Sequence, residues 1–201
     1  IFRLRQFIIL LIGFVSLSIS SFGATPAKQD AKDLGIAIDY FQSGKYHEAL
    51  LIFARLDSLY RLNPRFRAYT ALCYYYDDDF QHASKIMDEV LPQLTVFSPQ
   101  ERSVYYRACA DSHFQLQQLE TAAACYDSLL VLSHDNEKAE TYFMLGYIHV
   151  QQQQWIKALD NLQSSLVYYR RYLPGEKARI SQIRNMITGC CENINKKQAH
   201  Q

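Results

Sequence analysis

Small and large apolar residues recur along the chain at fixed spacings around four alanines. Three residues before each alanine stands a large side chain, and four residues after it stands another. Side chains three and four residues apart share one face of an α-helix, so each alanine marks the buried face of a predicted helix. The alanines are Ala49, Ala83, Ala122 and Ala158, the preceding residues are Tyr46, Phe80, Leu119 and Trp155, and the following residues are Phe53, Met87, Tyr126 and Leu162.

A second predicted helix precedes each of these four. Twelve residues before each alanine stands a small residue, nine before it stands a ring, and a polar segment separates the two helices. Small residues on both helices let the backbones cross closely, so the pattern predicts four antiparallel helix pairs. The small residues are Ala37, Ala71, Ala110 and Gly146, the rings are Tyr40, Tyr74, His113 and His149, and the polar segments are 42–45, 77–79, 115–118 and 151–154.

Some helix ends carry their own signals. Asn63 and Ser98 each precede a proline, which is typical of a capping side chain followed by proline at the first helical position. Glu101 stands where it completes a capping box with Ser98. Of the four polar turns, only the first has a glycine, Gly44, where a helix would end in a left-handed residue. Residues 91–97 add five residues between the second and third copies, and we expect them to interrupt a regular superhelix.

This array resembles a tetratricopeptide repeat protein, whose unit is a 34-residue helix-turn-helix. The resemblance covers about residues 31–170 and implies an all-α fold: a right-handed superhelical solenoid of about four repeats that binds a protein or peptide. Asp78 and Gln117 depart from it, because they replace the usual turn glycine. The fourth copy carries the signature at Tyr142, Leu145, Gly146, Trp155, Ala158 and Leu162, and the first carries it at Tyr40, Gly44, Tyr46, Ala49 and Phe53.

After the repeats, residues 174–195 show one more apolar stripe at helical spacing, from Ala178 and Ile180 to Ile194, with charged residues between. The end of a solenoid exposes an apolar stacking face, and a helix with one polar side covers it. We therefore predict a C-terminal capping helix. The alternative is a helix that leads into a further domain.

The first 23 residues differ from the rest of the chain. Arg3 and Arg5 precede an apolar stretch at residues 7–15, which gives way to serines and to Ser21 and Gly23. This layout is typical of a secretory signal peptide cleaved after Gly23. An uncleaved membrane anchor over residues 6–24 is the alternative. Either reading predicts a protein that works outside the cytoplasm, in the periplasm or cell envelope of a bacterium.

Composition and motifs limit the remaining functions. The formal net charge is +1, and lysine and arginine are scattered, so the basic surface that binds nucleic acid is not expected. The sequence contains no glycine-rich phosphate loop, GxSxG, HExxH or kinase signature. We therefore predict that the protein is not an enzyme and uses no cofactor.

The cysteines and histidines suggest packing rather than a metal site. The five cysteines are an odd number and lack CxxC spacing, so we expect core thiols and no metal. A disulfide between Cys109 and Cys125, on the two helices of the third copy, stays open. His113 and His149 hold equivalent places that could bring them together as a metal site or pH switch, although tyrosines at that place in the first two copies favour a packing role. Residues 77–79, three consecutive aspartates, are expected to form a solvated turn.

The aromatic content is the strongest functional signal, with fifteen tyrosines and eleven phenylalanines. In the resembling family, one side of each first helix faces the hollow of the superhelix, and rings on that side suit peptide binding. The expected partner-binding residues are Phe41, Leu72, Tyr75, Tyr76, Arg107, Asp111, Phe114, Phe143, Tyr147 and Gln151. Three alternatives stay open: the final helix or a second copy covers the hollow, or the array is an extracytoplasmic sensory or assembly domain of a membrane-anchored complex. The sequence leaves the oligomeric state undetermined.

Overall fold

The computed structural model describes the backbone of residues 26–199 and the side chains from Lys28 onward. Over these residues the regular elements are nine α-helices and two short 3-10 helices. The α-helices are α1 (Pro26–Gln42), α2 (Tyr46–Tyr60), α3 (Pro64–Tyr76), α4 (Phe80–Val90), α5 (Pro99–Gln115), α6 (Leu119–Leu132), α7 (Lys138–Gln151), α8 (Trp155–Tyr172) and α9 (Lys177–Ala199); the 3-10 helices are η1 (Leu91–Gln93) and η2 (Asp135–Glu137).

The predicted signal peptide at residues 1–23 and the alternative anchor at residues 6–24 both lie outside the described residues. Among the helices that the structure describes, none has both the length and the apolar character required to cross a bilayer.

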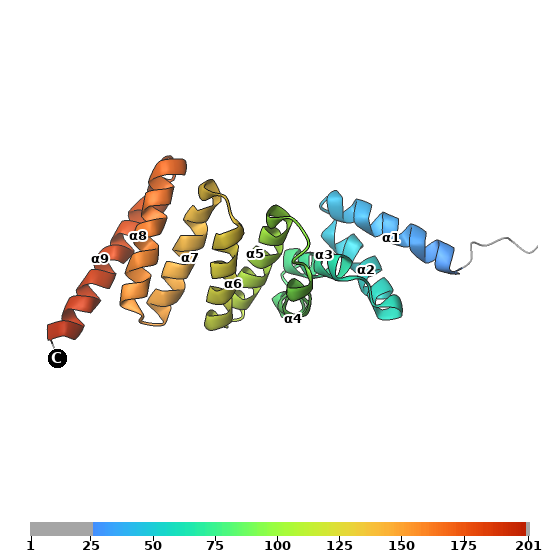
Figure 1. Ribbon diagram of the computed structural model, residues 1–201, viewed down its shortest axis with the longest axis horizontal. Coiled ribbons are helices and arrows are strands. Elements are labelled where there is room, and N and C mark those ends of the chain that lie inside the picture. The colour runs from blue at the N-terminus through green and yellow to red at the C-terminus, as the bar shows by residue number, and fades with distance from the viewer. Residues whose placement is uncertain (1–25, 200–201) are drawn as a thin grey trace, which may run out of the picture.

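The helices form a row in which each packs against the next along the chain. Four antiparallel pairs result: α1 with α2, α3 with α4, α5 with α6, and α7 with α8, followed by α9. Figure 1 shows α5 to α9 standing side by side, whereas α1 and α2 are turned away from that direction. Helices α3 and α5, the first helices of pairs two and three, also contact each other, and most of the predicted partner-binding residues lie on these two helices.

The small residues lie at the crossings, as predicted. Each of the four central alanines has no exposed surface. The residues twelve positions earlier are buried too, and so are the four large residues that follow the alanines. The repeat pattern therefore describes the core of every pair.

The crossing in the fourth pair has a glycine, Gly146, where the other three pairs have an alanine. A Cβ atom added to Gly146 of α7 would lie 2.7 Å from Cγ of Leu162 on α8, well inside van der Waals contact. Leu162 is fully buried, so it has no room to move aside. Only glycine fits this place without displacing α8.

The four turns within the pairs share one backbone conformation despite different residues. Gly44, Asp78, Gln117 and Gln153 all have φ between 57° and 73°, in the left-handed region. Each follows the first helix of its pair and satisfies a carbonyl of that helix through its own N–H. The chain thus makes the same turn with and without the glycine that favours it.

The predicted helix starts at Asn63 and Ser98 are confirmed, but the capping box is not. The Asn63 side chain accepts hydrogen bonds from two backbone N–H groups, and Ser98 Oγ accepts one from Glu101 N at 3.2 Å. The Glu101 carboxylate turns instead to Arg65, at 2.8 and 3.0 Å, and accepts the Tyr105 hydroxyl at 2.7 Å. A bidentate bond to a guanidinium is stronger than one to a neutral N–H, which explains the choice.

The extra segment between pairs two and three does not interrupt the stacking. Its residues form η1, and Leu91 and Leu94 are buried in the same apolar core as residues of α3, α5 and α6. These leucines fill the space between the two pairs, so pairs two and three stay in contact across the insertion. At the other end, α9 packs Ile180, Ile183 and Cys190 against α7 and α8, so the predicted capping helix is present.

Candidate functional site

Two hollows lie over helices α3 and α5, where most of the predicted partner-binding residues gather. We name them the Phe114 hollow and the Arg107 hollow, after a residue found in only one of them. The Phe114 hollow, of about 440 Å³, is lined by Tyr75, Tyr76, Asp78, Phe80, Asp111, Phe114, Gln115, Tyr126 and Met144. The Arg107 hollow, of about 310 Å³, is lined by Leu72, Tyr75, Tyr76, Ser103, Val104, Arg107, Ala108, Ser133 and Glu137.

Tyr75 and Tyr76 form the wall between the two hollows, because both rings line both of them. The rings meet edge to face, with centroids 5.1 Å apart. Tyr76 also stacks on Tyr46 of α2 at 4.0 Å, which fixes its plane while leaving 48% of the residue exposed. A rigid ring with a large open face suits binding, since little side-chain freedom is lost on contact.

Asp111 holds the tyrosines of the Phe114 hollow in place. Its carboxylate accepts hydrogen bonds from the Tyr75 hydroxyl at 2.8 Å and from the Tyr126 hydroxyl at 2.5 Å. Burial, and then the charge of Asp111, raise the pKa of both tyrosines well above the usual range. Both hydroxyls therefore remain neutral donors over the physiological range of pH, and the network joins α3, α5 and α6.

The remaining exposed candidates lie beyond the two hollows. Tyr147 of α7 meets Phe114 edge to face at 6.0 Å and is 36% exposed. Gln151 is exposed one turn further along the same helix. Neither residue lines either hollow. They extend the polar and aromatic surface towards pair four without enclosing a space.

Three predicted contact residues are buried or partly buried. Leu72 is buried and forms the floor of the Arg107 hollow. Phe41 stacks on Tyr69 at 4.6 Å and joins the cores of the first two pairs. Phe143 is only 4% exposed, because the Arg179 guanidinium of α9 lies 4.2 Å from the centre of its ring. The final helix thus covers this ring in pair four, whereas both hollows lie at pairs two and three.

The sequence matches no protein-family model and no curated protein. Solved structures do resemble the chain. MamA of AMB-1 superposes with a TM-score of 0.67 at 12% identity, over 85% of each chain. MamA of Desulfovibrio magneticus RS-1, from residue 41 to its end, gives 0.55 at 15% identity, over 83% of this chain and 96% of that one. A putative kinesin light chain of Podosopora anserina, with nearly identical TPR-like repeats, gives 0.57 at 13% identity, over 85% and 89%.

The chain has a tetratricopeptide-like fold. The predicted right-handed solenoid of about four helix pairs with a C-terminal capping helix is thereby confirmed. Sequence identities this low show similarity of fold alone, so any binding surface has to be inferred from the residues of this chain.

Several residues of the two hollows were not predicted as contacts. Phe80 and Tyr126 were assigned to the core of the tetratricopeptide-like pattern, and both residues also line the Phe114 hollow. Asp78 enters it because its left-handed turn conformation carries the residue to the rim. Glu137 comes from η2, which no spacing rule marked. The carboxylates of Asp78 and Asp111 make the Phe114 hollow acidic, while Arg107 and Glu137 give the other hollow both signs.

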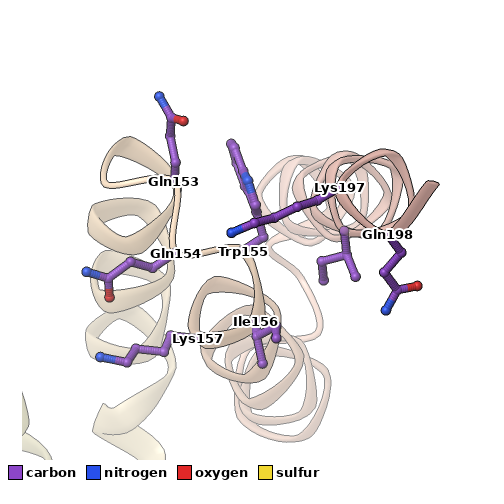
Figure 2. Close-up of a pocket in the computed structure, with 8 residues that line it drawn as sticks. Gln153, Gln154, Trp155, Ile156, Lys157, Lys197 and Gln198 are labelled. Atoms are coloured by element: carbon purple, nitrogen blue, oxygen red, sulfur yellow. The ribbon is translucent and has the colours of Figure 1, made fainter. Parts of the chain in front are cut away.

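A further cavity, of about 490 Å³, lies at the C-terminal end of the tetratricopeptide-like array, away from all the predicted contacts. Figure 2 shows the Trp155 and Lys197 side chains beside each other in it, with Ile156 below them. Trp155 and Ile156 begin α8, and Lys197 lies near the end of α9. The cavity therefore lies between the start of α8 and the end of α9.

Sulfur and imidazole groups meet at a separate place, inside pair three. Cys109 and Cys125 are free thiols whose sulfur atoms lie 3.3 Å apart. His113 is buried beside them, whereas His149, its equivalent in pair four, is partly buried and has a buried Nδ1 that bonds to no described protein group. His113 is thus buried, as its expected packing role requires, and it also makes polar contacts with neighbouring side chains.

Proposed function

We propose that this protein is an interaction scaffold that binds a peptide segment of a partner protein across the Phe114 and Arg107 hollows. The carrying observation is the pair Tyr75 and Tyr76, which separates two adjoining hollows and is fixed by Asp111 and Tyr46. Each hollow is large enough for one side chain or a few. A bound segment would place successive side chains on either side of the tyrosine wall.

The charges of the hollows indicate the chemistry of that segment. The Phe114 hollow combines rings with two carboxylates, so it favours an apolar side chain that also carries a donor or a positive charge. The Arg107 hollow, floored by Leu72, offers one guanidinium beside Glu137 and suits an uncharged polar or carboxylate side chain. Such a surface binds without catalysing a reaction.

The export of the protein belongs to the same proposal. The basic, apolar and small-residue order of residues 1–23 supports a signal peptide and a place in the bacterial periplasm or cell envelope. N-terminal sequencing of the exported protein tests it. A first residue of Ala24 supports a soluble protein, an intact N-terminus on a membrane-bound chain supports the anchor at residues 6–24, and a chain retained in the cytoplasm contradicts export.

Peptide selection tests the binding surface. Random peptides displayed on phage are selected against the purified chain, and the affinity of the enriched peptides is measured by fluorescence polarisation. Removing the exposed face of Tyr76 in Tyr76→Ala should weaken binding by tenfold or more, a typical cost for a central aromatic contact. The matched control is Val131→Ala on α6, since Val131 is an exposed apolar residue on a second helix and lines neither hollow.

Two results would contradict the proposal. The first is equal affinity of wild type and Tyr76→Ala for every enriched peptide. The second is equal loss in Tyr76→Ala and Val131→Ala, which would place binding elsewhere or show a general effect on folding. Circular dichroism of both variants separates these two cases.

A further inference from the structure

Four side chains with metal-binding atoms meet where helices α4, α5 and α6 adjoin. Cys109 and His113 lie on α5 one turn apart, so both face the same way. Cys125 comes from α6 and Asp88 from α4. The ligand atoms of the two cysteines and the histidine all lie within 4.8 Å of one another, and all three residues are buried.

We infer that Cys109, Cys125, His113 and Asp88 bind one tetrahedral divalent cation of the zinc class. Two thiolates, one imidazole and one carboxylate form a ligand set that zinc accepts in closed, structural sites. Soft sulfur ligands disfavour magnesium and calcium, which prefer oxygen. The cation would link pair two to pair three.

The distances between the groups are close to those of a tetrahedron. Zinc bonds of about 2.3 Å to sulfur and about 2.0 Å to nitrogen or oxygen place two sulfurs about 3.8 Å apart, and a nitrogen and an oxygen about 3.3 Å apart. The sulfurs of Cys109 and Cys125 are 3.3 Å apart. Oδ1 of Asp88 lies 3.0 Å from Nε2 of His113 and 3.8 Å from Sγ of Cys109. Movements of about half an ångström would admit the ion.

Gln118 orients the histidine for this role. Its Oε1 lies 2.5 Å from Nδ1 of His113, so the imidazole donates its Nδ1 proton there, and a cation bound at Nε2 would replace the proton that Nε2 shares with Oδ1 of Asp88. Nε2 points to the same side as Asp88. The Asp88 side chain is 52% exposed, which gives an ion a way in from solvent.

The repeat register shows that packing alone does not require these residues. The place of Cys109 is held by isoleucine, threonine and leucine in the other three pairs, and the place of Cys125 by isoleucine twice and asparagine once. None of these six residues is a cysteine, so the repeat packs at both places without a thiol. The thiols coincide with the one junction where the chain has extra residues, 91–97, and a metal would fasten α4 to α5 and α6 beside it. The residues at the place of Cys109 are Ile36, Thr70 and Leu145, and those at the place of Cys125 are Ile52, Ile86 and Asn161.

A disulfide between the two thiols is the main rival. It needs the sulfurs about 2.0 Å apart, more than an ångström closer than they lie, and it uses only two of the four groups. The cation uses all four groups, including the His113 and Asp88 side chains, which already lie 3.0 Å apart. The metal site is therefore the arrangement that the geometry favours.

Cobalt and zinc titrations test the site. The purified chain is reduced, freed of metal with a chelator and titrated with Co²⁺ alone. One equivalent should give thiolate-to-cobalt charge-transfer absorption and the visible bands of tetrahedral cobalt, and Zn²⁺ should remove both. Cys125→Ser should lose the charge-transfer intensity of one thiolate. Asp88→Asn, at an exposed position that the fold tolerates, should bind Zn²⁺ at least tenfold more weakly in competition with a chromophoric chelator.

The control is Cys73→Ser, which alters another buried cysteine far from the cluster and should leave the spectrum unchanged. Circular dichroism verifies that each variant is folded. The proposal is overturned if wild type shows no charge-transfer band, or if Cys125→Ser or Asp88→Asn binds as wild type does. It is also overturned if the zinc-treated chain, left in air, is found by mass spectrometry with Cys109 joined to Cys125.

Discussion

Arg107 and Phe143 hold the same place in successive helix pairs, fifteen residues before the central alanine. Arg107 borders an open hollow on pair three. Phe143 is buried on pair four, because Arg179 of α9 lies over its ring. The Arg179 guanidinium also donates a hydrogen bond of 3.3 Å to the carboxylate of Glu140 on α7. What covers a position thus depends on the helix that follows it, and the repeat register alone does not decide between a binding surface and a core.

The residues eleven positions before the alanine show the same contrast. Asp111 in pair three accepts two tyrosine hydroxyls and sets the wall of a hollow. Tyr147 in pair four meets the rings of Phe114 and Phe143 and lines neither hollow. At this position pair three therefore places a carboxylate beside open space, and pair four places a ring among other rings. Four substitutions, each paired with a control substitution, test this difference.

The largest change in stability is expected when the buried ring of Phe143 is removed. Phe143→Ala should lower the free energy of unfolding by about 3–5 kcal/mol, since it removes a buried ring between α7 and α9. Arg107→Ala, at the equivalent open place, should change it by less than about 1 kcal/mol. Urea denaturation followed by circular dichroism measures both. Equal losses would show that the two places are equally part of the core.

The second-largest change in stability is expected at the crossing of α7 and α8. Gly146→Ala should destabilise the protein by about 2 kcal/mol, because overpacking against Leu162 outweighs the gain in helix propensity. Gly189 of α9 is the matched control: a Cβ there meets no atom within 4 Å, so Gly189→Ala should stabilise by up to about 1 kcal/mol. Thermal unfolding of the two variants should therefore shift in opposite directions. A stabilised Gly146→Ala would mean that α7 and α8 can separate without cost.

The helix pairs could be predicted from sequence because the core follows local spacing. Ala122, for example, is buried for the same reason as Ala158, and the register carries one prediction to all four pairs. The site depends on contacts between pairs, which spacing along one helix does not encode. Phe143 was predicted as a contact because the residue that covers it, Arg179, comes thirty-six residues later and is not indicated by the sequence of its own helix. The ligands of the proposed metal site escaped a search for CxxC because they lie on three helices, although Cys109 and His113 one turn apart were a usable signal.

A smaller effect is expected in the polar network of pair three. Tyr126→Phe removes one of the two hydroxyls that Asp111 accepts, at a cost of about 1.5 kcal/mol for a hydrogen bond to a charged group. Tyr142→Phe is the control, since the Tyr142 ring stacks on Tyr168 in pair four and its hydroxyl makes no hydrogen bond within the described chain. Its unfolding midpoint in urea should match wild type. A Tyr126→Phe variant as stable as wild type would show that pair three does not depend on its polar contacts.

The smallest effect should come from the turns, where the pairs differ in residue but not in conformation. Gln153 adopts φ of 57°, a region that costs a residue with a Cβ about 1–2 kcal/mol. Gln153→Gly removes that cost but gives the unfolded chain more freedom, so a net gain of about 0.5 kcal/mol is expected. Gln152→Gly is the control, because Gln152 has φ of −81° and gains nothing from glycine. It should destabilise the protein, and a gain of equal size in both variants would mean that the left-handed turn carries no strain in pair four.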